Sequence, residues 1–326
     1  MVEGGRFLKY ALLVLVLAAA VWVIWTKWRW FSVLLHVAWF PLTLLLVTRV
    51  LTSLSNAWRF RVATKIFGLD LPAAKWIGLS ATTVLYGKIL PLRLGAAVRA
   101  VYLKREYGFS YSDYVSLMLG TNVLEIFAVA VIGTGACMPY LSRDSAGAPM
   151  LMATFGIVAA VAVGGGALGV FASQRPVATR FQKLDTLIAR LQASGQAYSR
   201  SGFDAAALLA STVVYLALRI MALWLCFWAV GTQVELAAAA GIIAAGSLTA
   251  VLPVTPGNIG VWEGATIGAS TALGIDIAVA TPVVVLSRAT TLLAQVLIGV
   301  AFSYVLFGTA RPSAIRSSLT HPHCET

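Results

Sequence analysis

Six ionisable residues interrupt the apolar stretches of this sequence and are its strongest candidates for chemistry. A charged side chain costs roughly 2.5–3.5 kcal/mol near the centre of a membrane helix. Left unpaired, the six would together cost about 15–20 kcal/mol, which exceeds the usual net stability of a fold. We therefore expect them to be paired or hydrated and to form a substrate-binding site. They are Arg49, Arg99, Glu125, Arg219, Glu263 and Arg288.

The signs of four of these charges alternate between the two halves of the chain. Arg99 precedes Glu125 in the first half, and Glu263 precedes Arg288 in the second. We therefore predict two ion pairs, Arg99 with Glu125 and Glu263 with Arg288. Two interpretations stay open. The pairs either only lock neighbouring helices together, or they line a cavity suited to an anionic head group.

Each half of the chain also contains an apolar helix that must break. One apolar run stops at Leu90-Pro91 and another at Leu252-Pro253, and a shorter helical piece follows each. Proline ends a helix and glycine permits a turn. Non-helical chain at membrane depth needs partners from protein or water, so such a break lines or closes a cavity. The residues predicted to form the breaks are Pro91, Gly95, Pro253, Pro256, Gly257 and Gly260.

Four polar residues beside these breaks complete the candidate binding site. Thr255 and Asn258 lie within the second break, where they could donate hydrogen bonds to a substrate or satisfy the break itself. Lys88 and Arg93 flank the first break. They could add positive charge to a cavity, or their long side chains could reach the cytoplasmic interface.

The composition of the chain places all these residues in a membrane protein. Of its 326 residues, 60% are hydrophobic and 11% are charged, whereas soluble domains have about 25% charged residues. This excludes a cytosolic globular enzyme. Apolar runs of about 20 residues are long enough to cross the hydrocarbon core as helices. We predict an all-α polytopic protein with six transmembrane helices, at about 7–26, 30–54, 111–136, 149–172, 203–231 and 276–308.

The two remaining apolar segments, about 73–106 and 236–273, are predicted to be re-entrant helical hairpins. With a cytoplasmic N-terminus, two such hairpins put 15 basic residues inside and 3 outside. Eight full crossings would instead put about 9 and 11 on the two sides. The positive-inside rule therefore favours hairpins that enter from opposite sides of the membrane, with both termini in the cytoplasm.

This topology predicts an internal repeat, in which a span, a hairpin and a second span recur at about 30–136 and 203–308. The two repeats run in opposite directions, as in many secondary transporters. Their spacing agrees, with 34 residues from Pro91 to Glu125 and 35 from Pro253 to Arg288. We assign residues 1–310 to one transmembrane domain, about 176–200 to an interfacial helix within it, and 311–326 to a cytoplasmic tail.

Motifs of several other function classes are absent from the sequence. It has no GxxxxGK segment and no HExxH segment, and its three cysteines lack the CxxC spacing of metal or redox sites. We therefore expect no cofactor, no metal and no catalytic residue. The net charge of +12 is scattered among the loops, which favours contact with anionic lipid over nucleic acid.

The segment from Pro253 to Glu263 followed by Arg288, together with the earlier Pro91, Gly95, Arg99 and Glu125, resembles a known family. This is the flippase-like membrane family that contains the transmembrane part of bacterial lysylphosphatidylglycerol synthases and proteins associated with hopanoid biosynthesis. The resemblance covers about residues 10–308. Two positions depart from the family pattern, Ala96 where an acidic residue is common and Asn258 where a glycine is common.

The resemblance implies a lipid-transport domain in the bacterial cytoplasmic membrane. We predict a flippase that moves an amphipathic, anionic or polar-headed lipid between leaflets through a central charged cavity. The implied partners are membrane lipids, such as an anionic phospholipid, a hopanoid or a polyprenyl-linked lipid, and a separate lipid-synthesis enzyme. Two alternatives stay open: a membrane-embedded transferase that uses Glu125 or Glu263 as a base, and a scaffold for lipid-synthesis enzymes.

Overall fold

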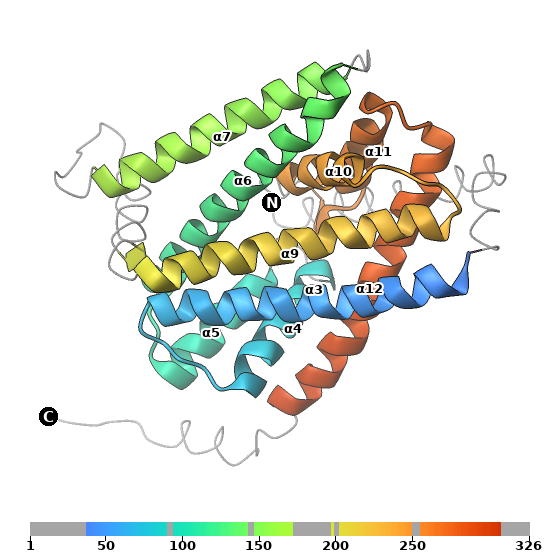
Figure 1. Ribbon diagram of the computed structural model, residues 1–326. Helices are drawn as coiled ribbons and strands as arrows, with labels where there is room; N and C mark the ends of the chain where they lie inside the picture. The colour runs from blue at the N-terminus through green and yellow to red at the C-terminus, as the bar shows by residue number, and fades with distance from the viewer. Residues whose placement is uncertain are drawn as a thin grey trace, which may run out of the picture. The chain divides into compact units, whose positions relative to one another are not determined.

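The structure, a computed structural model, describes residues 37–89, 94–142, 147–171, 197–198, 202–249 and 255–307. In these ranges all the regular structure is helical (Figure 1). The helices are α3 (Trp39–Ile66), α4 (Ala73–Ile89), α5 (Leu94–Tyr107), α6 (Tyr111–Leu141), α7 (Ala148–Phe171), α9 (Gly202–Ala229), α10 (Leu236–Leu248), η5 (Pro256–Asn258), α11 (Val261–Ala272) and α12 (Ile277–Phe307). The all-helical prediction is confirmed for the described part of the chain.

Four of these helices are long and apolar enough to cross a membrane, so the chain is a multi-pass membrane protein. The described residues that meet these criteria are Trp39–Ile66, Tyr111–Leu141, Gly202–Ala229 and Ile277–Phe302. The last three match the predicted spans closely. The first continues twelve residues beyond the predicted end at 54, because no glycine or proline follows until Gly68 and the intervening polar residues do not stop a helix.

The other predicted spans are described only in part. Helix α7 corresponds to the predicted span 149–172 within one residue at each end, and its segment Ala148–Gly164 is apolar. The predicted span 7–26, the tail 311–326 and nearly all of the interfacial helix 176–200 lie outside the described residues. A count of six spans therefore stays a prediction.

The two segments predicted to be re-entrant hairpins each contain two short helices in the described part of the chain. Helices α4 and α5 lie side by side, and so do α10 and α11 (Figure 1). The first break, Leu90–Arg93, lies outside the described residues, and so does the beginning of the second, Ala250–Val254. These short helices fit the hairpin prediction, and the side from which each hairpin enters the membrane stays a prediction.

The loops around the two hairpins share glycines with positive φ at equivalent places. The helix before each hairpin and the last helix of each hairpin are followed by a glycine in the left-handed region, at Gly68, Gly108, Gly231 and Gly274, with φ between 67° and 84°. Such glycines satisfy the last carbonyl groups of a helix without steric cost. Helices α4 and α10 both begin five residues after their glycine, and α6 and α12 both begin three residues after theirs.

The chain divides into two compact units, and each contains one hairpin. We name them by these hairpins. The described residues of the α10–α11 unit are 37–49, 125–142, 147–163, 216–249 and 255–291. Those of the α4–α5 unit are 50–89, 94–124, 164–171, 197–198, 202–215 and 292–307. Each unit therefore takes segments from both predicted repeats.

The α10–α11 unit is built around close contacts between helices. Phe155 of α7 and Ile242 of α10 are fully buried. A Cβ added at Gly133 of α6 would lie 2.8–2.9 Å from Phe155 and from Ala244 of α10. Real Cβ atoms are not found so close to other atoms, so glycine at 133 allows α6 to approach α7 and α10.

The α4–α5 unit has its own apolar core, formed by parts of α3, α4, α5, α6 and α9. Phe60, Trp76, Leu103 and Tyr114 are among its buried side chains. Segment 292–307 of α12 also belongs to this unit, where a Cβ at Gly299 would come within 2.8 Å of Leu85. Each hairpin is therefore packed into a core of its own.

Candidate functional site

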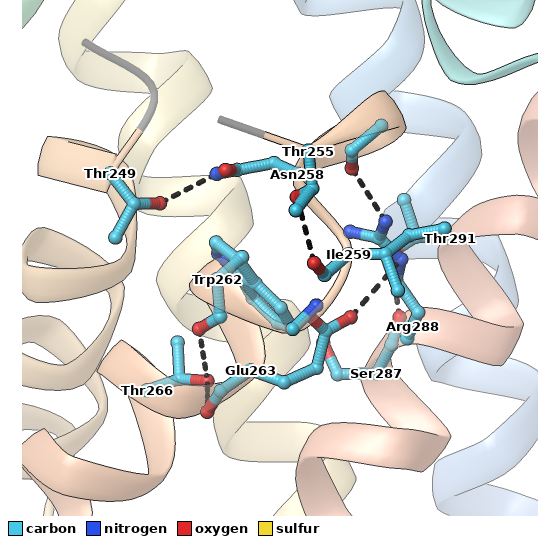
Figure 2. A network of polar contacts seen from close by, with 12 residues as sticks. Thr249, Thr255, Asn258, Ile259, Trp262, Glu263, Thr266, Ser287, Arg288 and Thr291 are labelled. Atoms are coloured by element: carbon cyan, nitrogen blue, oxygen red, sulfur yellow. Dashed lines mark hydrogen bonds and ion pairs between the residues drawn. The ribbon is translucent and has the colours of Figure 1, made fainter. Parts of the chain in front are cut away.

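Glu263 and Arg288 form the predicted ion pair at the break between α10 and α11 (Figure 2). Arg288 Nε lies 3.3 Å from Glu263 Oε1, and their side chains are 16% and 21% exposed. A second guanidinium nitrogen, Nη2, donates to the carbonyl oxygen of Gly257 at 2.6 Å. The backbone N–H of Gly260 donates to Glu263 Oε2 at 2.8 Å. Arg288 therefore binds both the Glu263 carboxylate and a backbone carbonyl group of the break between α10 and α11.

Glu263 has this position because it lies in the first turn of α11, where the backbone N–H groups have no carbonyl partner within the helix. A carboxylate at the third position of a helix reaches back to such a group and is stabilised by the helix dipole. The start of α11 is therefore already occupied by an anion from the chain itself. A substrate anion would have to displace Glu263 in order to bind there.

In the structure, Thr255 and Asn258 make hydrogen bonds to other residues at the break (Figure 2). Thr255 Oγ1 donates to the carbonyl oxygen of Ile259 at 2.7 Å. Asn258 Nδ2 donates to Thr249 Oγ1 at 2.7 Å, across the break. Asn258 has φ of 58° and Gly257 φ of 61°, and asparagine is one of the few residues besides glycine that adopts this conformation readily. Of the two roles that the sequence left open for these residues, the contacts favour the structural one.

The second predicted pair, Arg99 with Glu125, is wrong, because Glu125 pairs with Arg219 of α9. Arg219 Nη1 lies 3.8 Å from Glu125 Oε1, and their side chains are 19% and 26% exposed. Helix length explains the error. Arg99 lies about 12 Å before the end of α5, whereas Glu125 lies about 21 Å after the start of α6. In an antiparallel pair, Arg99 reaches residues nearer to the start of α6.

Arg99 instead contacts neutral side chains in the α4–α5 unit. Its Nε donates to the hydroxyl of Tyr114 at 2.9 Å, and its Nη2 lies 3.1 Å from the sulfur of Met118. Its guanidinium carbon lies 4.2 Å from the ring centroid of Phe60. Arg99 is 8% exposed. None of the ion pairs found among the described residues includes Arg99.

Arg49 is bound to α12 directly before Arg288. Its Nη2 donates to Ser287 Oγ at 2.7 Å and to the Ser287 carbonyl oxygen at 3.2 Å. Cys226 Sγ lies 3.9 Å from the same nitrogen, and Arg49 is only 7% exposed. The α10–α11 unit therefore contains three arginines of the predicted site, Arg49, Arg219 and Arg288, and both acidic partners.

The remaining predicted site residues are only partly visible. Pro91, Arg93 and Pro253 lie outside the described residues, as does the side chain of Lys88. Gly95 is buried in α5 against α4, where a Cβ would overlap the carbonyl oxygen of Thr83 and lie 2.6 Å from the backbone nitrogen of Gly87. Gly246 of α10 also lies at a close helix contact, since a Cβ there would lie 2.6 Å from the Thr266 side chain and 2.7 Å from Trp262 Nε1, both of α11.

Sequence reasoning missed several residues that hold these arginines. Ser287 binds Arg49, and Phe60, Tyr114 and Met118 surround Arg99. For Tyr114 and Met118 a signal was present, because they are separated by four residues on one face of α6, at the height of Arg99. Among the described residues, no group of three or more histidine, cysteine, aspartate or glutamate side chains could hold a metal ion.

Comparison with known proteins agrees with the resemblance noted in the sequence. A family model described as "Lysylphosphatidylglycerol synthase TM region" matches residues 7–299. The searches of curated proteins and of solved structures each gave no match. The matched region contains both hairpins and every predicted site residue. The chain therefore belongs to the family of lysylphosphatidylglycerol synthase TM regions.

Proposed function

We propose that this protein is a flippase, which moves an amphipathic lipid between the leaflets of the bacterial cytoplasmic membrane. The family associates the chain with membrane lipids. The observation that carries the proposal is the pair of partly exposed ion pairs in the α10–α11 unit. The four side chains of Arg219–Glu125 and Arg288–Glu263 are 16–26% exposed, although each lies in an apolar helix.

A polar head group needs such a site in order to leave the aqueous interface. In hydrocarbon it would lose its hydrogen bonds to water, at a cost of several kcal/mol for each unsatisfied group. Guanidinium and carboxylate groups that keep some accessible surface can replace these bonds, while the hydrocarbon chains of the lipid stay in the membrane. An ion pair with no accessible surface could only stabilise helix packing. The side chains of these two pairs keep 16–26% of their surface exposed.

The test is lipid exchange in proteoliposomes that contain a fluorescent phospholipid. We expect the wild-type protein to make the inner-leaflet probe accessible to a membrane-impermeant quencher. The double variant Glu125→Gln/Arg219→Gln should slow this exchange at least about tenfold, which corresponds to a loss of roughly 1.4 kcal/mol of barrier lowering. A matched control is Arg61→Gln, since Arg61 is more exposed and pairs with Asp70 at 3.7 Å.

The proposal would be contradicted if liposomes that contain the wild-type protein exchange lipid no faster than protein-free liposomes. It would also be contradicted by a Glu125→Gln/Arg219→Gln protein that exchanges lipid as fast as the Arg61→Gln control. Lipid mass spectrometry of a deletion strain separates transport from transferase chemistry. A missing lipid species would indicate an enzyme, whereas an unchanged set of lipids with an altered leaflet distribution would support the flippase.

The predicted topology can be tested by cysteine labelling in a background without the native cysteines. Ala74 and Glu106 are exposed near the two ends of the first hairpin, and Leu236 and Thr271 are exposed near the two ends of the second. We expect Ala74→Cys and Glu106→Cys to react from the cytoplasm only, and Leu236→Cys and Thr271→Cys from the outside only. Labelling of Ala74→Cys and Glu106→Cys from opposite sides would show instead that the first hairpin crosses the membrane.

A further inference from the structure

The ring of Tyr198 lies directly against the backbone of α6 in the α4–α5 unit. Together with Ala197 it packs on the apolar core of this unit, four residues before α9 begins at Gly202. A Cβ added at Gly120 of α6 would overlap Cε2 of the Tyr198 ring and lie 2.7 Å from its hydroxyl oxygen. The ring therefore fits at this place only because position 120 has no side chain.

Phe67, which follows the end of α3, contacts the same ring. The ring centroids of Phe67 and Tyr198 are 6.1 Å apart and their planes meet at 86°, an edge-to-face arrangement. Phe67 makes a similar contact at 6.5 Å with Phe109, in the turn before α6. Lys65 of α3 and Asp204 of α9 also form an ion pair at 3.4 Å, but the Lys65 side chain is 54% exposed, and exposed pairs contribute little. Tyr198 thus joins the segment before α9 to both α3 and α6.

The hydroxyl group of Tyr198 does not contribute to this contact. Its oxygen is buried and makes no hydrogen bond to the described part of the chain. Tyr114, a buried tyrosine of the same unit, instead accepts a hydrogen bond from Arg99 Nε at 2.9 Å. A buried donor without an acceptor disfavours an arrangement about tenfold or more. Phenylalanine would supply the same ring without this penalty, so the observed contact favours phenylalanine at position 198.

We propose that Tyr198 is a releasable latch, which binds the start of α9 to α6 in this structure and leaves Gly120 at another stage of the transport cycle. After release the hydroxyl reaches water at the membrane interface, where a tyrosine has one apolar and one hydrated end. A hydroxyl that is unsatisfied in one state and hydrogen-bonded in the other brings the two states closer in free energy. The inference rests on the proposed function and concerns its rate, because α6 and α9 also carry Glu125 and Arg219.

Tyr198→Phe tests the latch, since it keeps the ring and removes only the hydroxyl. We expect the thermal unfolding midpoint, Tm, of the purified full chain to rise by about 1–3 °C. Because the closed latch is then more stable, lipid exchange in proteoliposomes should slow at least about fivefold. A role in packing alone predicts the higher Tm with an unchanged exchange rate, and that result would overturn the proposal. A lower Tm would also overturn it, since the hydroxyl would then be hydrogen-bonded in the folded protein.

Two other tyrosines of the same unit serve as controls. Tyr111 at the start of α6 is 46% exposed, so Tyr111→Phe should leave both Tm and the exchange rate unchanged. Tyr114→Phe removes a hydroxyl that is hydrogen-bonded to Arg99, so its Tm should fall, opposite to the change in Tyr198→Phe.

Fluorine NMR detects the latch without any lipid exchange. The full chain with 3-fluorotyrosine at position 198, in lipid nanodiscs, should give a buried signal and a released signal, and a water-soluble paramagnetic agent should broaden only the released one. Gly120→Ala should increase the released signal, because the added methyl group would overlap the Tyr198 ring. Signals that the agent leaves unchanged in both proteins would overturn the latch.

Failure of this inference and failure of the flippase proposal give different results. If the released signal is present but liposomes with the wild-type protein show no lipid exchange, Tyr198 is released and the flippase proposal fails. If lipid exchange is fast and Tyr198→Phe exchanges lipid as fast as wild type, the flippase proposal stands and the latch fails.

Discussion

Replacement of Arg288 by alanine is expected to lower the free energy of unfolding by about 3 kcal/mol, the lower end of the cost of breaking a buried ion pair, because the two side chains keep 16% and 21% of their surface exposed. Arg288 supports two groups, the Glu263 carboxylate at 3.3 Å and the Gly257 carbonyl oxygen at 2.6 Å. Its loss leaves a charge with little access to water and an unsatisfied carbonyl group in a left-handed turn. The measurement is the thermal unfolding midpoint of the detergent-solubilised protein, followed by size-exclusion chromatography of heated samples.

Glu263→Gln should cost less than Arg288→Ala, because the glutamine oxygen can still accept the hydrogen bond from Gly260. In the double variant Arg288→Met/Glu263→Gln no charge is left unpaired, so it should regain part of the loss. Arg61→Ala is the control for removal of an arginine, with an expected cost of about 0–1 kcal/mol at an exposed pair. If Arg288→Ala unfolds at the same temperature as Arg61→Ala, the pair does not stabilise the break.

The helices were predictable because the chain marks their ends clearly. Apolar runs bounded by glycine, proline and charged residues gave α6, α9 and α12 nearly as observed. The end of α3 was placed too early, since the polar residues after position 54 resemble a loop although no residue there stops a helix. The four left-handed glycines were visible as residues, but only backbone angles show that they end helices in the same way.

The candidate site was predictable only where the sequence order determines the contact. Glu263 and Arg288 lie about 14 Å and 17 Å from the turn that joins α11 to α12, so two antiparallel helices bring them together. Glu125 and Arg219 are 94 residues apart, and nothing in their spacing shows that α6 and α9 pack against each other. The stacking of Arg99 on Phe60 was also hidden, because the two residues are 39 positions apart and nothing in their spacing shows that α3 packs against α5.

Gly95→Ala is expected to destabilise the protein by about 1–3 kcal/mol, although alanine is the better helix former. The added methyl group would overlap the Thr83 carbonyl oxygen and lie 2.6 Å from the Gly87 nitrogen. These are backbone atoms of α4, which cannot rotate away as a side chain could, so α4 and α5 must separate. Since Arg99 lies one turn after Gly95 on α5, the separation should also move it relative to Tyr114. Thermal unfolding of the purified protein, compared with wild type, measures the loss of stability.

Gly87→Ala is the matched control, because Gly87 lies on the opposite helix of the same contact and a Cβ there would meet no atom within 4 Å. It should raise the free energy of unfolding by up to about 1 kcal/mol through helix propensity alone. The two substitutions add the same methyl group to the same hairpin, and the contact between α4 and α5 predicts opposite signs for them. Equal stabilisation by Gly95→Ala and Gly87→Ala would show that α4 and α5 are not in close backbone contact.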